Sequence, residues 1–129
     1  MRYLAGEDIL EIHNEIIEKT GGAHGIRDVG LFLSAIERPK ARYGGEELYP
    51  DVFHKAAAYF DSFAKHHVFV DGNKRTAFAA AVRFLFVNGY EFMAGNKQVE
   101  EFTLRVVTQK LDVPIVASWL KKHAKKVKK

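Results

Sequence analysis

One stretch organises the chain: His67-Val68-Phe69-Val70-Asp71-Gly72-Asn73-Lys74-Arg75-Thr76-Ala77. Before it, apolar residues recur at helical spacing from Phe53 to Phe63, and after it an alanine-rich run continues to Val87. We therefore expect the stretch to join two helices, with Asn73 as the N-cap of the second. Because that second helix is apolar on nearly every side, it is predicted to be the central, buried one.

Helical periodicity continues on both sides of this pair and predicts four more helices, bounded by glycine, proline or N-cap residues. They run approximately over residues 8–19, 28–38, 97–108 and 112–120. Residues 41–49, with Gly44-Gly45 between tyrosines, predict a loop or a short β-hairpin, and residues 90–93 a short strand. The expected fold class is all-α: a compact bundle of about six helices in a single domain over residues 1–129.

The amino-acid composition limits the classes of protein to which this chain can belong. The chain has 129 residues, 47% hydrophobic and 28% charged, as expected for one soluble globular domain. It has no cysteine, which excludes disulfides, thiolate metal sites and a cysteine nucleophile. There is no apolar run of the kind found in signal peptides or membrane spans. We expect a cytoplasmic protein with no membrane partner.

The net charge of +4 comes from the C-terminal end. Residues 121–129 contain six lysines, and without them 14 basic residues face 16 acidic ones, a net charge of −2. We expect this basic tail to be a frayed, solvated helix end. The alternative is that it contacts an acidic partner or RNA; apart from this tail, no nucleic-acid partner is expected.

The stretch His67–Ala77 combines the parts of a phosphate-transfer site. A helix N-terminus binds anions through free amides and its dipole, and Gly72 would let a phosphate approach the backbone. Lys74 and Arg75 oppose that dipole, which indicates that an anion belongs beside them. Asp71 is a hard carboxylate suited to Mg²⁺. Histidines titrate near neutral pH, so His67 could act as a general base.

Each of these residues alone has an ordinary structural interpretation. A single histidine at a helix end is usually a cap or a surface residue, and an Asn-Lys-Arg start is usually a solvated first turn. The other five histidines are expected at the surface or at the edge of the core. The combination of residue types at one helix start is what points to a site.

The same run resembles the H-x-F-x-[D/E]-[G/A]-N-[G/K]-R signature of the Fic/Doc family, and every defined position is present. Residues 25–39 resemble the first half of the family's death-on-curing (Doc-like) branch, and residues 99–102 and 112–120 resemble its C-terminal helices. The resemblance implies a Fic/Doc-type helical bundle with a β-hairpin flap. By position, the flap would be Arg42–Tyr49 and would align the target peptide by β-augmentation.

The resemblance also implies roles for the residues of the motif. His67 would be the catalytic base that deprotonates a hydroxyl group of a target protein, and Asp71 would bind Mg²⁺. The residues that would hold the phosphates of ATP are Gly72, Asn73, Lys74 and Arg75.

Two positions favour the Doc-like branch over the adenylyltransferases. Lys74 stands where those enzymes have glycine, and Phe78 stands where they have a second arginine. The resemblance thus implies a toxin that transfers the γ-phosphate of ATP to a target protein, expected to be a translation elongation factor, and so blocks translation. The alternatives are AMP transfer and a catalytically inactive binding module. The inhibitory motif [S/T]-x-x-x-E-[G/N] is absent, so a cognate antitoxin is expected as a partner.

Overall fold

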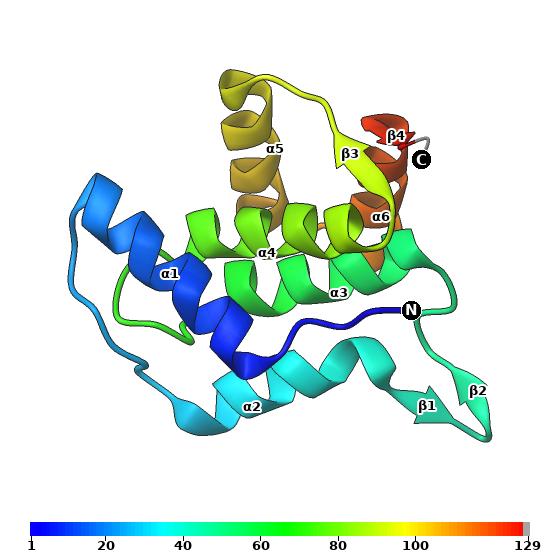
Figure 1. Cartoon of the computed structure of the whole chain (residues 1–129), viewed down its shortest axis with the longest axis horizontal. Helices are drawn as coiled ribbons and strands as arrows, with labels where there is room; N and C mark the ends of the chain where they lie inside the picture. The colour runs from blue at the N-terminus through cyan, green and yellow to red at the C-terminus, as the bar shows by residue number, and fades with distance from the viewer. Residues whose placement is uncertain (128–129) are drawn as a thin grey trace.

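The helices follow the predicted order and nearly the predicted bounds (Figure 1). A computed structural model describes residues 1–127, and within them the chain forms six α-helices. They are α1 (Gly6–Thr20), α2 (Val29–Glu37), α3 (Val52–Lys65), α4 (Asn73–Val87), α5 (Asn96–Thr108) and α6 (Val113–Lys122). A 3₁₀ turn, Arg38–Lys40, follows α2. The expected all-α class is confirmed. None of the helices among residues 1–127 combines the length and the apolar character needed to cross a membrane.

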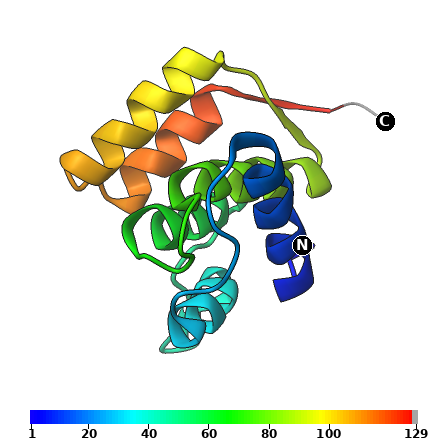
Figure 2. The same ribbon diagram turned by 90° about the vertical axis from the view of Figure 1, so that its left-hand side faces the viewer.

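The antiparallel pair α3 and α4 forms the centre of the molecule. Figure 2 shows α5 and α6 side by side on one flank of this pair, with α1 and α2 on the other. The rings of Phe102 and Trp119 stack at 4.1 Å between α5 and α6. A continuous apolar core therefore extends from α1 through the central pair to the C-terminal helices.

Of the two central helices, α3 is the more deeply buried. Its buried residues lie on every side and include Lys55, Asp61 and Ser62. Helix α4 buries one face, and on the other Phe86 is 59% exposed. The prediction that α4 is the enclosed helix is therefore wrong. Helices α2, α4, α5 and α6 all pack on α3, whereas α1 covers the outer face of α4 only in part.

The predicted hairpin is confirmed as strands β1 (Arg42–Tyr43) and β2 (Glu46–Glu47), in antiparallel register. Lys55 of α3, almost fully buried, donates a hydrogen bond from Nζ to Glu47 at 2.8 Å. This hydrogen bond lowers the pKa of the Glu47 carboxyl group. Because the hairpin precedes α3 and His67 follows it, the two lie at opposite ends of a helix of 14 residues, about 21 Å long.

The basic tail differs from its prediction over the residues described. Helix α6 ends at Lys122, and Ala124–Lys126 form strand β4, which pairs antiparallel with β3 (Tyr90–Phe92). The amide of Met93 donates to the carbonyl of His123 at 2.7 Å, and that of Val127 donates to Gly89 at 2.8 Å. The expected frayed helix end is wrong here, because a sheet satisfies these backbone groups. The last two residues of the tail lie outside the described part.

The N-terminal segment also reaches the turn after α4, close to the pair of strands β3 and β4. Arg2 exchanges two hydrogen bonds of 2.9 Å with the side chain of Asn88, at the C-terminal end of α4. Val127 bonds to the neighbouring Gly89. The two ends of the described chain thus converge on one turn, remote from the start of α4 (Figure 1).

A buried ion network fixes the C-terminal half of α3. Asp61 accepts a hydrogen bond of 2.7 Å from Arg38, and its other carboxylate oxygen lies 2.7 Å from Lys65 Nζ. Arg38 also donates to Tyr49, and Lys65 to the carbonyl of Leu111 at 2.7 Å. One carboxylate therefore ties α3 to the segment after α2, while Lys65 extends the network to the turn between α5 and α6.

Removing that carboxylate should destabilise the fold. Asp61→Asn leaves two largely buried cations without their counter-charge, so we expect the free energy of unfolding in urea to fall by about 3 kcal/mol. Glu37→Gln is the control, because it breaks an exposed ion pair with Lys40 and should change stability by less than about 0.5 kcal/mol. Equal effects of the two substitutions would contradict a special role for Asp61.

Candidate functional site

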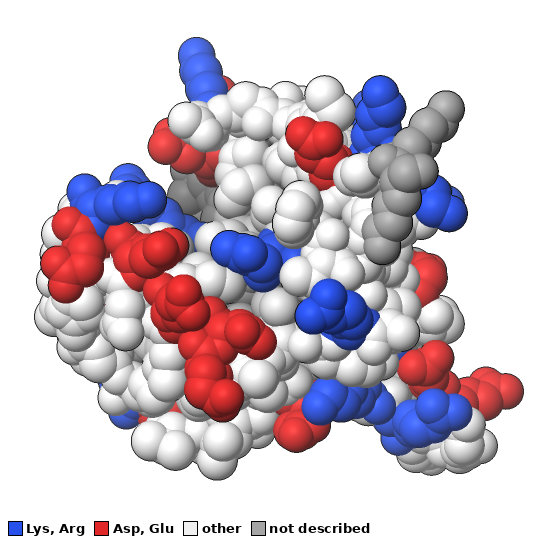
Figure 3. Space-filling model, in the orientation of Figure 1, with Lys and Arg blue, Asp and Glu red and all other residues white. Residues whose placement is uncertain are grey.

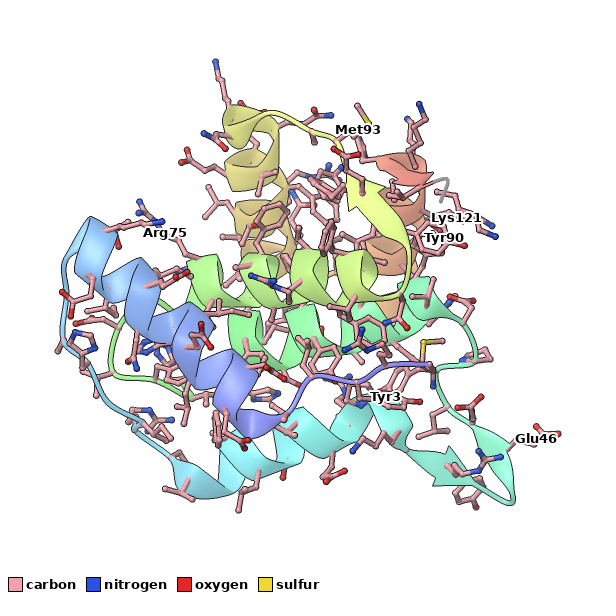
Figure 4. All side chains as sticks on the ribbon, in the orientation of Figure 1. Tyr3, Glu46, Arg75, Tyr90, Met93 and Lys121 are labelled. Atoms are coloured by element: carbon pink, nitrogen blue, oxygen red, sulfur yellow. The ribbon has the colours of Figure 1, made fainter. Side chains whose placement is uncertain are left out.

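All six residues singled out in the sequence line one pocket of about 590 Å³. They are His67, Asp71, Gly72, Asn73, Lys74 and Arg75. The other walls come from the end of α1 (Thr20–Gly22), the end of α3 (Ala64–His66) and Val107 of α5. The hairpin residues 41–49 are not among the lining residues, and Figure 4 shows Glu46 and Arg75 on opposite sides of the molecule. The expectation that this hairpin lies beside the site is therefore not met.

The segment that does lie beside the site is the connection between α1 and α2, residues 21–28. It runs antiparallel to residues 67–71, with a bridge between Ile26 and Phe69. The amide of Arg27 donates to Val68 at 2.8 Å, and the amide of Val70 donates to Gly25 at 3.1 Å. Arg27 also donates from Nε to the carbonyl of His67 at 2.6 Å. Residues 25–28, noted in the sequence only for their family resemblance, thus hold the loop that carries the site.

The side chain of Asn73 closes the loop. Its oxygen accepts from the amide of Phe69 at 2.9 Å, and its nitrogen donates to the carbonyl of Phe69 at 3.0 Å. The prediction that Asn73 is the N-cap is wrong: Gly72 occupies that position, and Asn73 is the first helical residue. Phe69 is fully buried and anchors the loop in the core.

Gly72 is required by the backbone and by packing. Its φ of 78° lies in the left-handed region, and an added Cβ would lie 3.1 Å from Ile17 and 3.7 Å from His13. The missing side chain therefore makes room for α1. This is a different reason from the close phosphate approach suggested by the sequence.

The start of α4 presents unsatisfied donors and positive charge. Within residues 1–127, the amides of Asn73, Lys74 and Arg75 have no acceptor, as expected for a first helical turn. Lys74 and Arg75 are exposed and form no ion pair with any described residue. In Figure 3, positive side chains lie where Figure 4 labels Arg75, next to an acidic band along α1. An anion at this helix start would meet both free amides and unpaired cations.

Asp71 lies at the rim of the same pocket. One carboxylate oxygen accepts from the amide of Ala23 at 2.7 Å, and the other has no hydrogen-bond partner in the described chain. Over residues 1–127, no group of three or more His, Asp or Glu side chains could enclose a metal. A single carboxylate fits Mg²⁺, which usually takes its remaining ligands from water and substrate phosphates.

His67 is exposed, and its imidazole has no partner among the described residues. Its backbone is held by Arg27, so the ring remains free to accept a proton from an incoming group.

A residue that the sequence did not single out lies behind the loop. His13 of α1 is 1% exposed, and its Nε2 is 2.8 Å from the carbonyl oxygen of Asp71. Its ring stacks on Phe69 at 3.9 Å. The only signal in the sequence was a histidine within the apolar stripe of the first helix.

Comparison with known proteins gives close matches over almost the entire chain. The profile of the Fic/DOC family matches residues 3–85. Toxin Doc of Mycolicibacterium smegmatis is 39% identical over 120 residues, which cover 92% of this chain and 90% of the relative. Protein kinase doc of Escherichia phage P1 is 33% identical over 122 residues, which cover 95% of each.

The packing requirement at Gly72 can be tested by comparing its substitution with that of Gly44, a glycine that has no close neighbours. Gly44 also has a positive φ, but nothing lies within 4 Å of an added Cβ. We expect both Gly72→Ala and Gly44→Ala to lose about 1–2 kcal/mol of stability from backbone strain. Gly72→Ala should lose about 1–3 kcal/mol more, because the methyl group meets Ile17. Equal losses in thermal unfolding would show that packing against α1 does not constrain the loop.

Proposed function

The chain belongs to the Fic/DOC family, and on that basis we propose that it is a Doc-like toxin that transfers the γ-phosphate of ATP to a hydroxyl group of a target protein. The two relatives are named a toxin and a protein kinase. The observation that carries the proposal is the start of α4, where unpaired amides, two unpaired cations, a carboxylate and a free imidazole surround one pocket.

In this proposal His67 accepts the proton of the target hydroxyl group. The hydroxyl oxygen forms a bond to the γ-phosphorus while the bond from that phosphorus to ADP breaks, and the imidazole keeps the proton. The amides at the start of α4, with Lys74 and Arg75, stabilise the negative charge on the phosphate oxygens. Asp71 would hold Mg²⁺ through its free oxygen, and the ion would neutralise further phosphate charge.

Two residues support phosphate transfer over AMP transfer. Lys74 places a side chain where adenylyltransferases leave space for a phosphate. Phe78, at the position of their second arginine, packs its ring 5.1 Å from that of Phe92. A second phosphate clamp on this turn of α4 is therefore missing, as in the Doc-like branch.

For the target, we propose docking along the connection between α1 and α2 and not along the hairpin. Ala23, Gly25 and Arg27 direct their hydrogen bonds to the loop of the site. The intervening residues, His24 and Ile26, have no backbone hydrogen-bond partner within residues 1–127. They leave an open strand edge beside His67 to which an extended segment can add by β-augmentation.

The remaining parts of the proposal follow the family. The target would be a translation elongation factor, modified in the cytoplasm, with translation blocked as the result. Because the sequence lacks the self-inhibitory motif, a separate cognate antitoxin would restrain the toxin.

Label transfer from ATP tests the reaction. In a cell extract with Mg²⁺, we expect the wild type to transfer label from γ-labelled but not α-labelled ATP. His67→Ala should lower the rate by about 10²–10⁴-fold, and removal of Mg²⁺ with EDTA should abolish transfer. His54→Ala is the control, because this histidine lies at the opposite end of α3, lines a different pocket and should be dispensable. Label from the α position would indicate AMP transfer instead. No label from either position would favour a binding module, and binding lost on removal of residues 121–129 would then point to the tail.

The phosphate-binding role of α4 can be tested with two arginines of the same helix. Arg75 lies in the first turn beside the pocket, whereas Arg83 is exposed two turns later and lines a different pocket. Arg75→Ala should weaken ATP binding by about 10- to 100-fold, since a hydrogen bond to a charged group contributes about 1.5–3 kcal/mol. Arg83→Ala should leave it unchanged. Equal effects in isothermal titration would argue against a phosphate site at this helix start.

A further inference from the structure

Within residues 1–127, His13 is the one buried side chain that bonds to the main chain of Asp71. Its Nε2 lies 2.8 Å from the Asp71 carbonyl oxygen. A carbonyl oxygen can only accept, so the imidazole donates and Nε2 carries the hydrogen. The contact joins α1 to the loop across 58 positions of sequence, which means that the fold as a whole determines its geometry.

The imidazole of His13 is also fixed by its own neighbours. One face stacks on Phe69 at 3.9 Å with an angle of 11° between the planes. Its edge lies 3.7 Å from the Cβ that Gly72 lacks. His13 therefore packs against residues on both sides of Asp71. The Nε2–H group of His13 cannot shift without moving either Phe69 or the start of α4.

Asp71 is held at one further point. One carboxylate oxygen is bonded to the amide of Ala23, so a single oxygen remains free. Lys74 and Arg75, three and four residues later, have no ion-pair partner in the described chain. If the main chain of Asp71 could move, its carboxylate could pair with one of these cations, and both the cation site and the phosphate site would be lost.

We propose that His13 is a positioning residue that fixes the main chain of Asp71, so that the free carboxylate oxygen stays available to a divalent cation and apart from Lys74 and Arg75. The proposal rests on the proposed function for the role of the cation. It requires a hydrogen-bond donor at position 13, and an aromatic ring alone should not suffice.

Three variants separate the donor from the ring and from general stability. His13→Gln keeps an N–H at a similar reach, and His13→Phe keeps the stack on Phe69 but has no donor. Ile12→Ala is the matched control: Ile12 is buried on the same helix, and its loss creates a cavity without touching Asp71. If His13→Phe does not fold, His13→Leu replaces it as the variant without a donor.

The first readout is the binding of Mn²⁺ and ADP by isothermal titration. We expect His13→Phe to weaken Mn²⁺-dependent ADP binding about tenfold. ADP binding in EDTA should weaken as well, because the Asp71 carboxylate would then compete with the phosphates for Lys74 and Arg75. The second readout needs no ligand: trypsin should cleave after Lys74 or Arg75 several-fold faster in His13→Phe, because the start of α4 opens more often. His13→Gln should stay near the wild type in both, and Ile12→Ala should lower stability without either change.

Wild-type behaviour of His13→Phe in both readouts would overturn the proposal. Equal effects of Ile12→Ala would overturn it too, since the loss would then reflect general destabilisation. If the wild type itself does not bind Mn²⁺ with ADP, the proposed function fails together with the cation part of this proposal. The trypsin comparison would still decide whether His13 holds the loop.

Discussion

The two hydrogen bonds between the Asn73 side chain and the Phe69 backbone are the constraint on which the site depends. These hydrogen bonds close a tight loop, so residues 70–72 cannot extend away from the core. Gly72 must then adopt a left-handed conformation, and α4 must begin at Asn73. A side chain used in this way cannot cap the helix, and this leaves the first amides of α4 open to a ligand.

The surroundings of this loop divide into a rigid base and an accessible rim. Below it, Asp61 ties the last turns of α3 to Arg38 and Lys65. Behind it, the connection between α1 and α2 pairs with residues 67–71. The side chains of His67, Lys74 and Arg75, which are proposed to act on substrate, stand on the rim, where they are exposed and have no partner among residues 1–127. Preorganisation of this kind reduces the reorganisation that a reaction would otherwise require.

Local patterns in the sequence were enough to predict the six helices and to identify the residues of the motif. Apolar spacing gave six helices, and the candidate residues are neighbours in sequence, so one short loop brings them together. The errors concern contacts between distant segments. Nothing near Asn73 shows that its amide turns back to Phe69, and nothing near His13 shows that it reaches Asp71. A lysine-rich segment has no alternation of polar and apolar residues to reveal that β4 pairs with β3.

The hairpin is an error of a different kind, because its existence was predicted correctly and its location was not. Its position before α3 places it a full helix length from His67, and this follows once α3 is known to be continuous. Burial was also misjudged: α4 was expected to be the enclosed helix, yet α3 is, and it accommodates Lys55 and Asp61 through ion pairs.

The two ends of the described chain meet at the turn after α4, and this has a consequence for the connectivity of the fold. Arg2 and Val127 bind adjacent residues, Asn88 and Gly89, at the opposite end of α4 from the site. The order of the helices along the chain is thus not imposed by their packing. A circular permutant with these ends joined by a short linker, opened at the hairpin turn between Gly44 and Gly45, would keep the contacts around the pocket.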